Sequence, residues 1–171
     1  MHIFNAMLYF YRMSLKKIIS GGQTGVDRAA LDACLKMDFP CGGWCTAGRN
    51  AEDGEIPLHY PLQEIWSTNY DDRTRKNIRS SDATLIIYEG NLSGGSLLTH
   101  NYAKEIGQPL FLFKLSPFFI DDPLEQLLHF LNINQVETLN IAGPRASQWT
   151  KAYESSFFIT SKLIQKINSP I

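Results

Sequence analysis

Two glycine pairs restrict the folding of this chain more than any other feature, because each separates an apolar run from a helix. Gly21-Gly22 follows the short apolar run 18–20, and Gly94-Gly95 comes after 83–88, the clearest buried strand in the sequence. Behind the first pair, Val26, Ala30, Ala33 and Met37 recur at helical spacing. The sequence therefore predicts units made of a strand, a glycine turn and a helix.

The remaining segments continue this alternation of strands and helices. Strands are expected at 18–20, 62–66, 83–88, 109–113 and 138–142, and helices at 26–37, 70–80, 96–106, 121–131 and 150–167. Near-continuous apolar strands between helices are typical of a parallel sheet that is covered on both faces. The expected fold class is α/β, a Rossmann-like three-layer sandwich in which helices flank a mostly parallel sheet.

Local signals refine this prediction at three places. Thr24 and Asp27 have the spacing of a capping box at the start of the first helix. In the closing helix, Tyr153 and Phe157 are expected to point inward. Residues 42–61 follow neither the helical nor the strand period, and a loop of this length in a compact domain is more often functional than neutral.

Composition excludes several classes of protein. A length of 171 residues fits one domain, and a formal net charge of −1 gives no domain-wide positive field for nucleic acid. No stretch approaches the ~20 apolar residues of a membrane helix. The cysteine count is odd, no secretory segment precedes the cysteines, and no second ligand pair completes a metal site. We therefore expect a cytoplasmic protein with reduced thiols and no bound metal.

The first residues fall outside these patterns. Residues 1–14 continue no pattern that follows, and they are interpreted as an N-terminal extension before a single domain at 15–171. Met13 would make a natural start, so the segment could be an artefact of start-site assignment. An arm that binds a partner is the alternative interpretation.

Three glycine-bearing turns point to a ligand that carries a phosphate group. They lie at 21–25, 93–96 and 142–145, each after an apolar strand. The carboxyl ends of parallel strands meet at one edge of a sheet, which is where ligands bind. Helix N-termini offer unpaired N–H groups there, and glycines let an anion approach them. Neither the dinucleotide fingerprint nor the Gly-Lys-Ser/Thr phosphate loop is present, which argues against a standard NAD dehydrogenase or ATPase.

Several blocks of residues form a recognisable pattern, in order between residues 16 and 145. The most specific block is 21–32, which reads Gly-Gly-Gln-Thr-Gly-Val-Asp-Arg-Ala-Ala-Leu-Asp. Later blocks are Gly42-Gly43-Trp44-Cys45, Gly48-Arg49, Ala51-Glu52-Asp53-Gly54, Ile56-Pro57, Tyr60-Pro61-Leu62, Arg73-Thr74 with Asn77, Ser81–Ile86, Ser93-Gly94-Gly95 with Leu98-Thr99, and Leu139–Arg145. In these blocks the chain resembles the molybdenum cofactor carrier family. This resemblance implies a Rossmann-like protein, related to cytokinin-activating hydrolases, that carries molybdenum cofactor (molybdopterin) as cargo.

Individual roles follow from the turns and from the resemblance together. The phosphate would lie on Gly94-Gly95-Ser96 and Gly21-Gly22, with Arg49 or Arg145 supplying charge-assisted bonds. Asp27 or Asp53 could accept N–H bonds from a pterin or guanine ring, on which Trp44 could stack; a helix cap, a turn former and a core aromatic are the alternatives for these three. The expected ligand contacts are Gly21, Gly22, Gln23, Thr24, Asp27, Arg28, Trp44, Arg49, Glu52, Asp53, Arg73, Asn77, Ser93, Gly94, Gly95, Ser96, Thr99, Gly143 and Arg145.

Two other functions remain open on the sequence alone. One is a hydrolase that cleaves the glycosidic bond of a nucleoside monophosphate, but Asn101 stands where the related hydrolases carry their catalytic glutamate. Glu52 or Asp53 could replace that glutamate only if the 42–61 loop folded over the pocket. The other is a nucleotide sensor, which would use the same pocket.

Self-association is a further expectation. Parallel α/β domains with apolar helix faces often form homo-oligomers. Here Phe118, Phe119, Phe157 and Phe158 could form such a surface.

Overall fold

A computed structural model describes residues 14–116 and 123–169 of the chain. The predicted N-terminal extension therefore lies outside the described residues, except for Ser14, whose Oγ donates to the carbonyl of Val136 at 2.8 Å. Phe118 and Phe119, two of the residues expected at an oligomer surface, also lie outside them.

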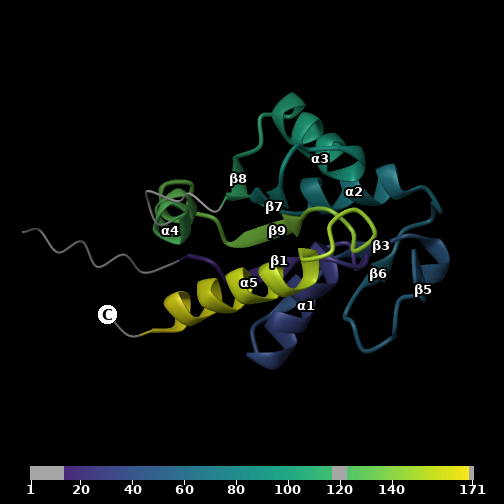
Figure 1. The fold of residues 1–171 in the computed structure, drawn as a ribbon, viewed down its shortest axis with the longest axis horizontal. Helices are drawn as coiled ribbons and strands as arrows, with labels where there is room; N and C mark the ends of the chain where they lie inside the picture. The colour runs from purple at the N-terminus through teal and green to yellow at the C-terminus, as the bar shows by residue number, and fades with distance from the viewer. Residues whose placement is uncertain (1–13, 117–122, 170–171) are drawn as a thin grey trace, which may run out of the picture.

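Five parallel strands form the central sheet; the apolar runs predicted four of them, and the two-residue strand β2 was not expected. They are β1 (Lys17–Ile19), β2 (Cys41–Gly42), β7 (Ala83–Glu89), β8 (Leu110–Leu115) and β9 (Thr138–Ala142). Their spatial order is β2-β1-β9-β7-β8, so the last strand of the sequence lies at the centre of the sheet (Figure 1). Leu139 of β9 is in register with Ile18 on one side and with Ala83 on the other.

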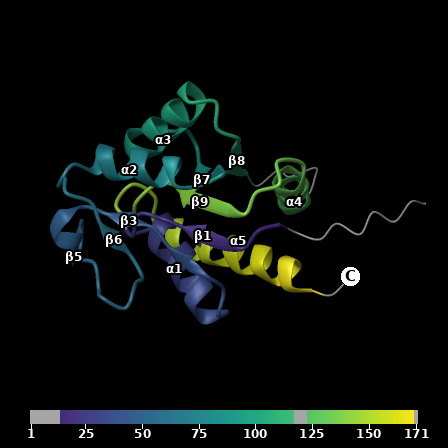
Figure 2. The same ribbon diagram turned by 180° about the vertical axis from the view of Figure 1, so that it is seen from behind.

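Helices cover both faces of this sheet, which gives the three layers expected from the sequence (Figures 1 and 2). One layer contains α1 (Val26–Lys36), α4 (Pro123–Ile133) and α5 (Ala152–Asn168). The opposite layer contains α2 (Tyr70–Arg79) and α3 (Gly94–Glu105). This division follows from the right-handed crossover that joins parallel strands, because chain segments that run in opposite directions across the sheet then cover opposite faces.

The larger core lies between the sheet and the layer that contains α1. Strand residues such as Leu85 and Ile141 pack there against Ala30 of α1 and Leu163 of α5. Five core positions of α1 are no larger than valine or cysteine, which lets this helix lie close to the strands; they are Val26, Ala29, Ala30, Ala33 and Cys34. The smaller core under α2 and α3 is built on Ile78, Tyr102 and Ala103.

The strand order has a direct consequence for ligand binding. A chain that began at β9 and then continued from β1 would have the strand order 3-2-1-4-5 of a doubly wound nucleotide-binding fold. β9 is followed by α5 on one face, whereas its neighbour β7 is followed by α3 on the other. The carboxyl ends of β9 and β7 therefore form the switch point of the sheet, where ligands bind in such folds.

The 42–61 segment, expected as a loop, is organised by very short strands. β3 (Trp44–Cys45) pairs with β6 (Gln63–Glu64), and β4 (Asn50–Ala51) forms a hairpin with β5 (Gly54–Glu55) after the 3₁₀ turn η1 (Ala47–Arg49). A second apolar cluster fixes the segment to α1; its members are Leu31, Cys45, Ile56, Tyr60 and Leu62. The strand expected at 62–66 is confirmed only as the two residues of β6.

Three local predictions were wrong. The capping box is absent: Gly25 precedes α1 without a side-chain cap, because the Thr24 hydroxyl donates to Glu52 and the Asp27 carboxylate pairs with Arg73. Helix α3 begins at Gly94, so its two glycines belong to the first turn. Tyr153, expected inside, is 40% exposed because its hydroxyl donates to Asp32 at 2.7 Å on the surface of α1. No helix among the described residues combines the length and apolar character needed to cross a membrane.

Candidate functional site

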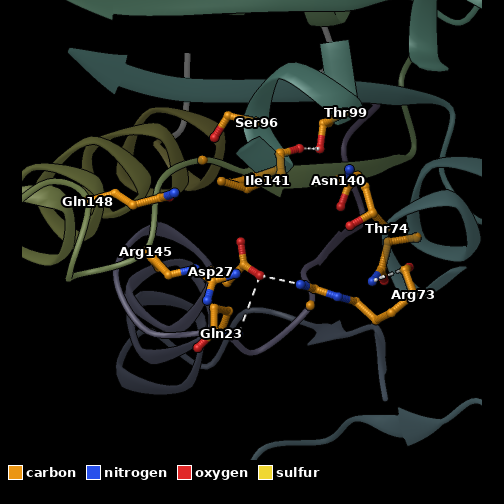
Figure 3. A pocket seen from close by; sticks show the side chains of 15 residues that line it. Gln23, Asp27, Arg73, Thr74, Ser96, Thr99, Asn140, Ile141, Arg145 and Gln148 are labelled. Carbon is orange, nitrogen blue, oxygen red and sulfur yellow. Dashed lines mark hydrogen bonds and ion pairs between the residues drawn. The ribbon is translucent and has the colours of Figure 1, made fainter. Parts of the chain in front are cut away.

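The three glycine-bearing turns line one cavity at the switch point of the sheet (Figure 3). The space between its walls measures about 500 Å³, part of which is open to solvent. The carboxyl end of β9 and one face of α2 complete the wall. Ten of the expected ligand contacts line the cavity: Gly21, Gln23, Asp27, Arg73, Asn77, Gly95, Ser96, Thr99, Gly143 and Arg145.

The first turn of α3 forms one end of the cavity. Helix N-termini carry unpaired N–H groups and a partial positive charge. Ser96 is 3% exposed, and its Oγ has no hydrogen-bond partner among the described residues. Gln148 approaches from the β9–α5 turn, with its Nε2 atom 3.2 Å from the position that a Cβ of Gly94 would take. This end of the cavity is therefore rich in donors, as an anion requires.

A second donor without a partner comes from the β1–α1 turn. Gln23 is 5% exposed, and its Oε1 accepts from the backbone N of Thr24 at 3.0 Å and of Glu52 at 2.9 Å. These two bonds fix the orientation of the amide. Its Nε2 is buried and, among the described residues, has no acceptor. Two buried donors from two different turns thus belong to the same cavity.

Asp27 supplies a carboxylate to the opposite wall. Its Oδ2 accepts from Arg73 Nη1 at 2.8 Å and from the backbone N of Gln23 at 3.4 Å. Burial raises the pKa of Asp27, and Arg73 opposes this effect only in part. The Tyr70 ring holds the cation in place, since it contacts the guanidinium of Arg73 and also that of Arg145. Tyr70 was not expected at the site, because a tyrosine that opens a polar helix has no distinctive sequence signal.

Glu52 fastens the β4–β5 hairpin to two of the turns and does not line the cavity. Its carboxylate accepts from the Thr24 hydroxyl, from the backbone N of Ser147 at 3.1 Å and from Ser147 Oγ at 2.6 Å. Partial burial raises the pKa of Glu52, but the hydrogen bonds from Ser147 and Thr24 outweigh it, so the pKa lies below its ordinary value. Arg145 Nε is 3.9 Å from Glu52, which leaves this guanidinium only loosely held.

An ion pair between Asp53 and Arg28 stabilises the same hairpin. Asp53 accepts two hydrogen bonds from Arg28, one of them from Nη2 to Oδ1 at 3.1 Å, and the hydrogen bond from Arg28 lowers the pKa of Asp53. Arg28 Nη2 also donates to the carbonyl of Gly22 at 3.2 Å. Neither side chain lines the cavity. Arg28, Glu52, Asp53 and Thr24 therefore shape the site from behind its wall.

Arg49 is not available to a phosphate, contrary to expectation. It is 6% exposed, and its guanidinium donates to four backbone carbonyls at 2.9–3.2 Å, those of Ile56, Pro57, Tyr60 and Leu62. These bonds close the loop that follows the hairpin. Their partners lie within 13 residues of Arg49 in the chain, but no sequence pattern distinguishes such a clamp from a ligand contact.

Trp44 and Asn77 form a structural pair. The Asn77 side chain accepts from the backbone N of Trp44 at 2.9 Å and donates to its carbonyl at 2.8 Å, which ties α2 to β3. Lys76 lies over the Trp44 ring, 4.4 Å from its centre. Trp44 does not line the cavity, so the geometry does not bring it to a ligand there, whereas Asn77 does line it.

Three other expected contacts lie at the edge of the site. Gly22 has a φ of +78°, and a Cβ there would meet Leu62 at 2.4 Å, so this glycine serves the turn. Ser93 and Gly94 begin α3 but do not line the cavity. Sequence reasoning missed five lining residues, Thr74, Asn140, Ile141, Ala142 and Gln148. The sequence could have indicated Asn140, because it is a polar residue between the apolar residues of a predicted strand.

Cys34, Cys41 and Cys45 are free thiols. Within residues 14–116 and 123–169, no group of three or more His, Cys, Asp or Glu side chains could hold a metal ion.

Comparisons with known proteins agree with this architecture. Residues 18–164 match the model of the circularly permutated YpsA SLOG family. The crystal structure of a "Putative molybdenum carrier protein" from Syntrophus aciditrophicus is 41% identical in sequence, with a TM-score of 0.83; the match covers 91% of this chain and 96% of that one. Among curated proteins, none matches this sequence.

Proposed function

This chain belongs to the circularly permutated YpsA SLOG family, and we propose that it carries the molybdenum cofactor, a phosphorylated pterin, in the cavity at the switch point of its sheet. The observation that carries this proposal is the meeting of three glycine turns around two buried donors, Ser96 Oγ and Gln23 Nε2, that have no partner within residues 14–116 and 123–169. An unpaired donor in a buried site costs free energy unless a ligand satisfies it. The 41% identical protein described as a molybdenum carrier supports this choice of cargo.

The phosphate group would lie at the first turn of α3. Ser96 Oγ and the backbone N–H groups of that turn would donate to its oxygens, with Gln148 Nε2 beside them. Arg145 is the cation placed to assist, because it lines the cavity and is held by Glu52 only at 3.9 Å. Arg73 is less available, since Asp27 already accepts from it at 2.8 Å.

We propose carriage in preference to hydrolysis because of what Glu52 does. Hydrolysis of a nucleoside monophosphate would need a carboxyl group that can give up and take a proton near the ligand. Glu52 lies behind the wall of the cavity, and its carboxylate accepts three hydrogen bonds from Thr24 and Ser147 that hold its pKa low. These contacts favour a fastening role for Glu52.

Native mass spectrometry of the protein purified from its own host tests the cargo. We expect an added mass that corresponds to a phosphorylated pterin, with or without molybdenum. Protein that retains a different class of ligand in every preparation, or that releases free base from nucleoside monophosphates, would contradict carriage of the cofactor.

Calorimetric titration with inorganic phosphate tests the anion site separately. Ser96→Ala should weaken phosphate binding by about 10- to 150-fold, because one hydrogen bond to a charged group is lost. Ser161→Ala is the matched control, since Ser161 Oγ is also buried and has no partner in the described part of the chain, but lies on α5, away from the cavity. Equal affinities for the two variants would place the anion elsewhere.

A further inference from the structure

The wall that faces the anion-binding turn presents acceptor oxygens. Asn140, at the carboxyl end of β9, is 3% exposed and lines the cavity together with Asp27 (Figure 3). A ligand whose phosphate lies at α3 would bring its other end to this wall. The chemistry of the wall therefore restricts what that other end can be.

A chain of hydrogen bonds determines which atom Asn140 presents to the cavity. Gln108 Nε2 donates to the carbonyls of Ile78 at 2.6 Å and Ser81 at 2.8 Å, so its Oε1 must accept, and the Thr84 hydroxyl donates to it at 2.7 Å. The Thr84 oxygen then accepts from Asn140 Nδ2 at 3.2 Å. Since the amide nitrogen is engaged on the sheet side, Asn140 Oδ1 is left to face the cavity as an acceptor.

Asp27 is oriented in the same way by its partners. Arg73 Nη1 and the backbone N of Gln23 both donate to Oδ2. The other oxygen, Oδ1, points into the cavity (Figure 3). Burial raises the pKa of Asp27 and the ion pair with Arg73 opposes this only in part; in its ionised form the carboxylate only accepts hydrogen bonds.

Building on the proposed carrier function, we propose that Asp27 and Asn140 select phosphate-bearing ligands whose ring has a 2-amino-4-oxo-pyrimidine edge, the edge that guanine and pterins share. The exocyclic amine and the neighbouring ring N–H of this edge are donors that match the two acceptors. A ring with a carbonyl in place of the amine would direct an oxygen at the Asp27 carboxylate. A site built for a donor rejects such a ligand because its buried acceptors stay unpaired.

A series of nucleoside monophosphates tests this selection in the intact protein. Guanosine, inosine and xanthosine 5′-monophosphates differ at the 2-position of the ring, which carries an amine, a hydrogen and a carbonyl. We expect calorimetric titration to give the tightest binding for the amine, about 10- to 100-fold weaker binding for the hydrogen, and the weakest binding for the carbonyl. Equal affinities, or a preference for the carbonyl, would overturn the proposal.

A second pair of ligands distinguishes the pterin from the guanine source. Pterin and lumazine are the same bicyclic ring with an amine or a carbonyl at the 2-position, and inorganic phosphate added to both would fill the anion site. A preference for pterin over lumazine that exceeds the preference for guanosine over xanthosine monophosphate assigns the edge to a pterin. The opposite order assigns it to a guanine nucleotide, and no preference in either pair rules out the edge altogether.

Two matched aspartate variants test whether Asp27 is responsible for the discrimination between ring edges. Asp27→Asn should remove most of the discrimination between the 2-amino ligand and its 2-carbonyl analogue, because an amide can rotate to donate as well as accept. Asp53→Asn is the control, as Asp53 also pairs with an arginine but lies outside the cavity, and it should leave the discrimination unchanged. Loss of discrimination in both variants, or in neither, would refute a role for Asp27.

Inorganic phosphate separates the two proposals. If the Asp27→Asn variant binds phosphate as tightly as the unaltered protein, its fold and its anion site are intact. Any change in its discrimination between ring ligands then concerns ring selection alone. If the unaltered protein binds neither phosphate nor any phosphate ester, the carrier proposal itself fails.

Discussion

The guanidinium of Arg73 occupies the space beside Gly21, with Nη1 only 1.4 Å from the position that a Cβ atom of residue 21 would take. From there it donates to the buried carboxylate of Asp27 at 2.8 Å. The β1–α1 turn and the start of α1 thus meet α2 at one ion pair, although Arg73 lies 46 positions from Asp27 in the sequence. The absence of a side chain at Gly21 is what lets α2 close this side of the cavity.

Gly21→Ala should push Arg73 away from Asp27 and leave a buried carboxylate without its cation. We expect urea unfolding to show a loss of about 1–3 kcal/mol in the free energy of unfolding. Gly95→Ala is the control, because a Cβ there has no heavy atom within 4 Å. If the two variants are equally stable, the space beside Gly21 does not matter to the ion pair.

Glu52→Gln should reduce stability at neutral pH and make it less dependent on pH. The folded-state pKa of Glu52 lies below its ordinary 4.5, so its contribution to stability is present above pH 4.5 and is lost as the pH falls through the folded-state pKa. Thermal unfolding should be measured between pH 3 and pH 7. At pH 7 the free energy of unfolding of the unaltered protein should exceed that of the variant by about 1–2 kcal/mol, and this difference should disappear on acidification. Glu55→Gln, an exposed change on the same hairpin, should follow the unaltered protein across the range. An advantage that grows in acid would contradict this linkage.

Arg49→Lys should destabilise the fold although the charge is kept. The lysine ammonium lacks the planar fork that reaches the four carbonyls, so several buried acceptors lose their donor. The expected loss is roughly 2–4 kcal/mol in the free energy of unfolding, measured by urea titration. Arg79→Lys, at an exposed position of α2, should change it by less than about 0.5 kcal/mol. The folded Arg49→Lys protein should bind phosphate with unchanged affinity. A tenfold loss of phosphate affinity would show that Arg49 contributes to the ligand site after all.

Self-association remains a prediction, and the outer face of α5 is the place to test it. Phe158 is 62% exposed, and Tyr153 on the same helix is 40% exposed. We expect light scattering after size-exclusion chromatography to give the mass of two or more chains, and Phe158→Asp to shift the protein toward a single chain. Leu97→Asp, which changes a 41% exposed residue of α3 on the opposite face, should have no such effect. A single-chain mass for the unaltered protein would refute the prediction.

Sequence reasoning succeeded where the determining contacts are local. The period of the apolar residues predicted β9 at Thr138–Ala142 with its exact ends, and it predicted the ends of α2 within one residue. The glycine turns after the strands were enough to predict that these turns meet at one edge, since parallel strands leave their carboxyl ends there. Ser96, Gln23 and Gly143, which the sequence singled out as ligand contacts, line the cavity at that edge.

The sequence by itself determined that strands, glycine turns and helices alternate, because backbone propensity and apolar period depend on neighbouring residues. Only the tertiary structure decided which charged side chains are left for a ligand. Glu52 meets Ser147 across 95 positions and Arg73 meets Asp27 across 46, and only the packing of the helices and turns around the sheet brings these residues together. The partner of a charge determines its role, and that partner is chosen by the fold as a whole.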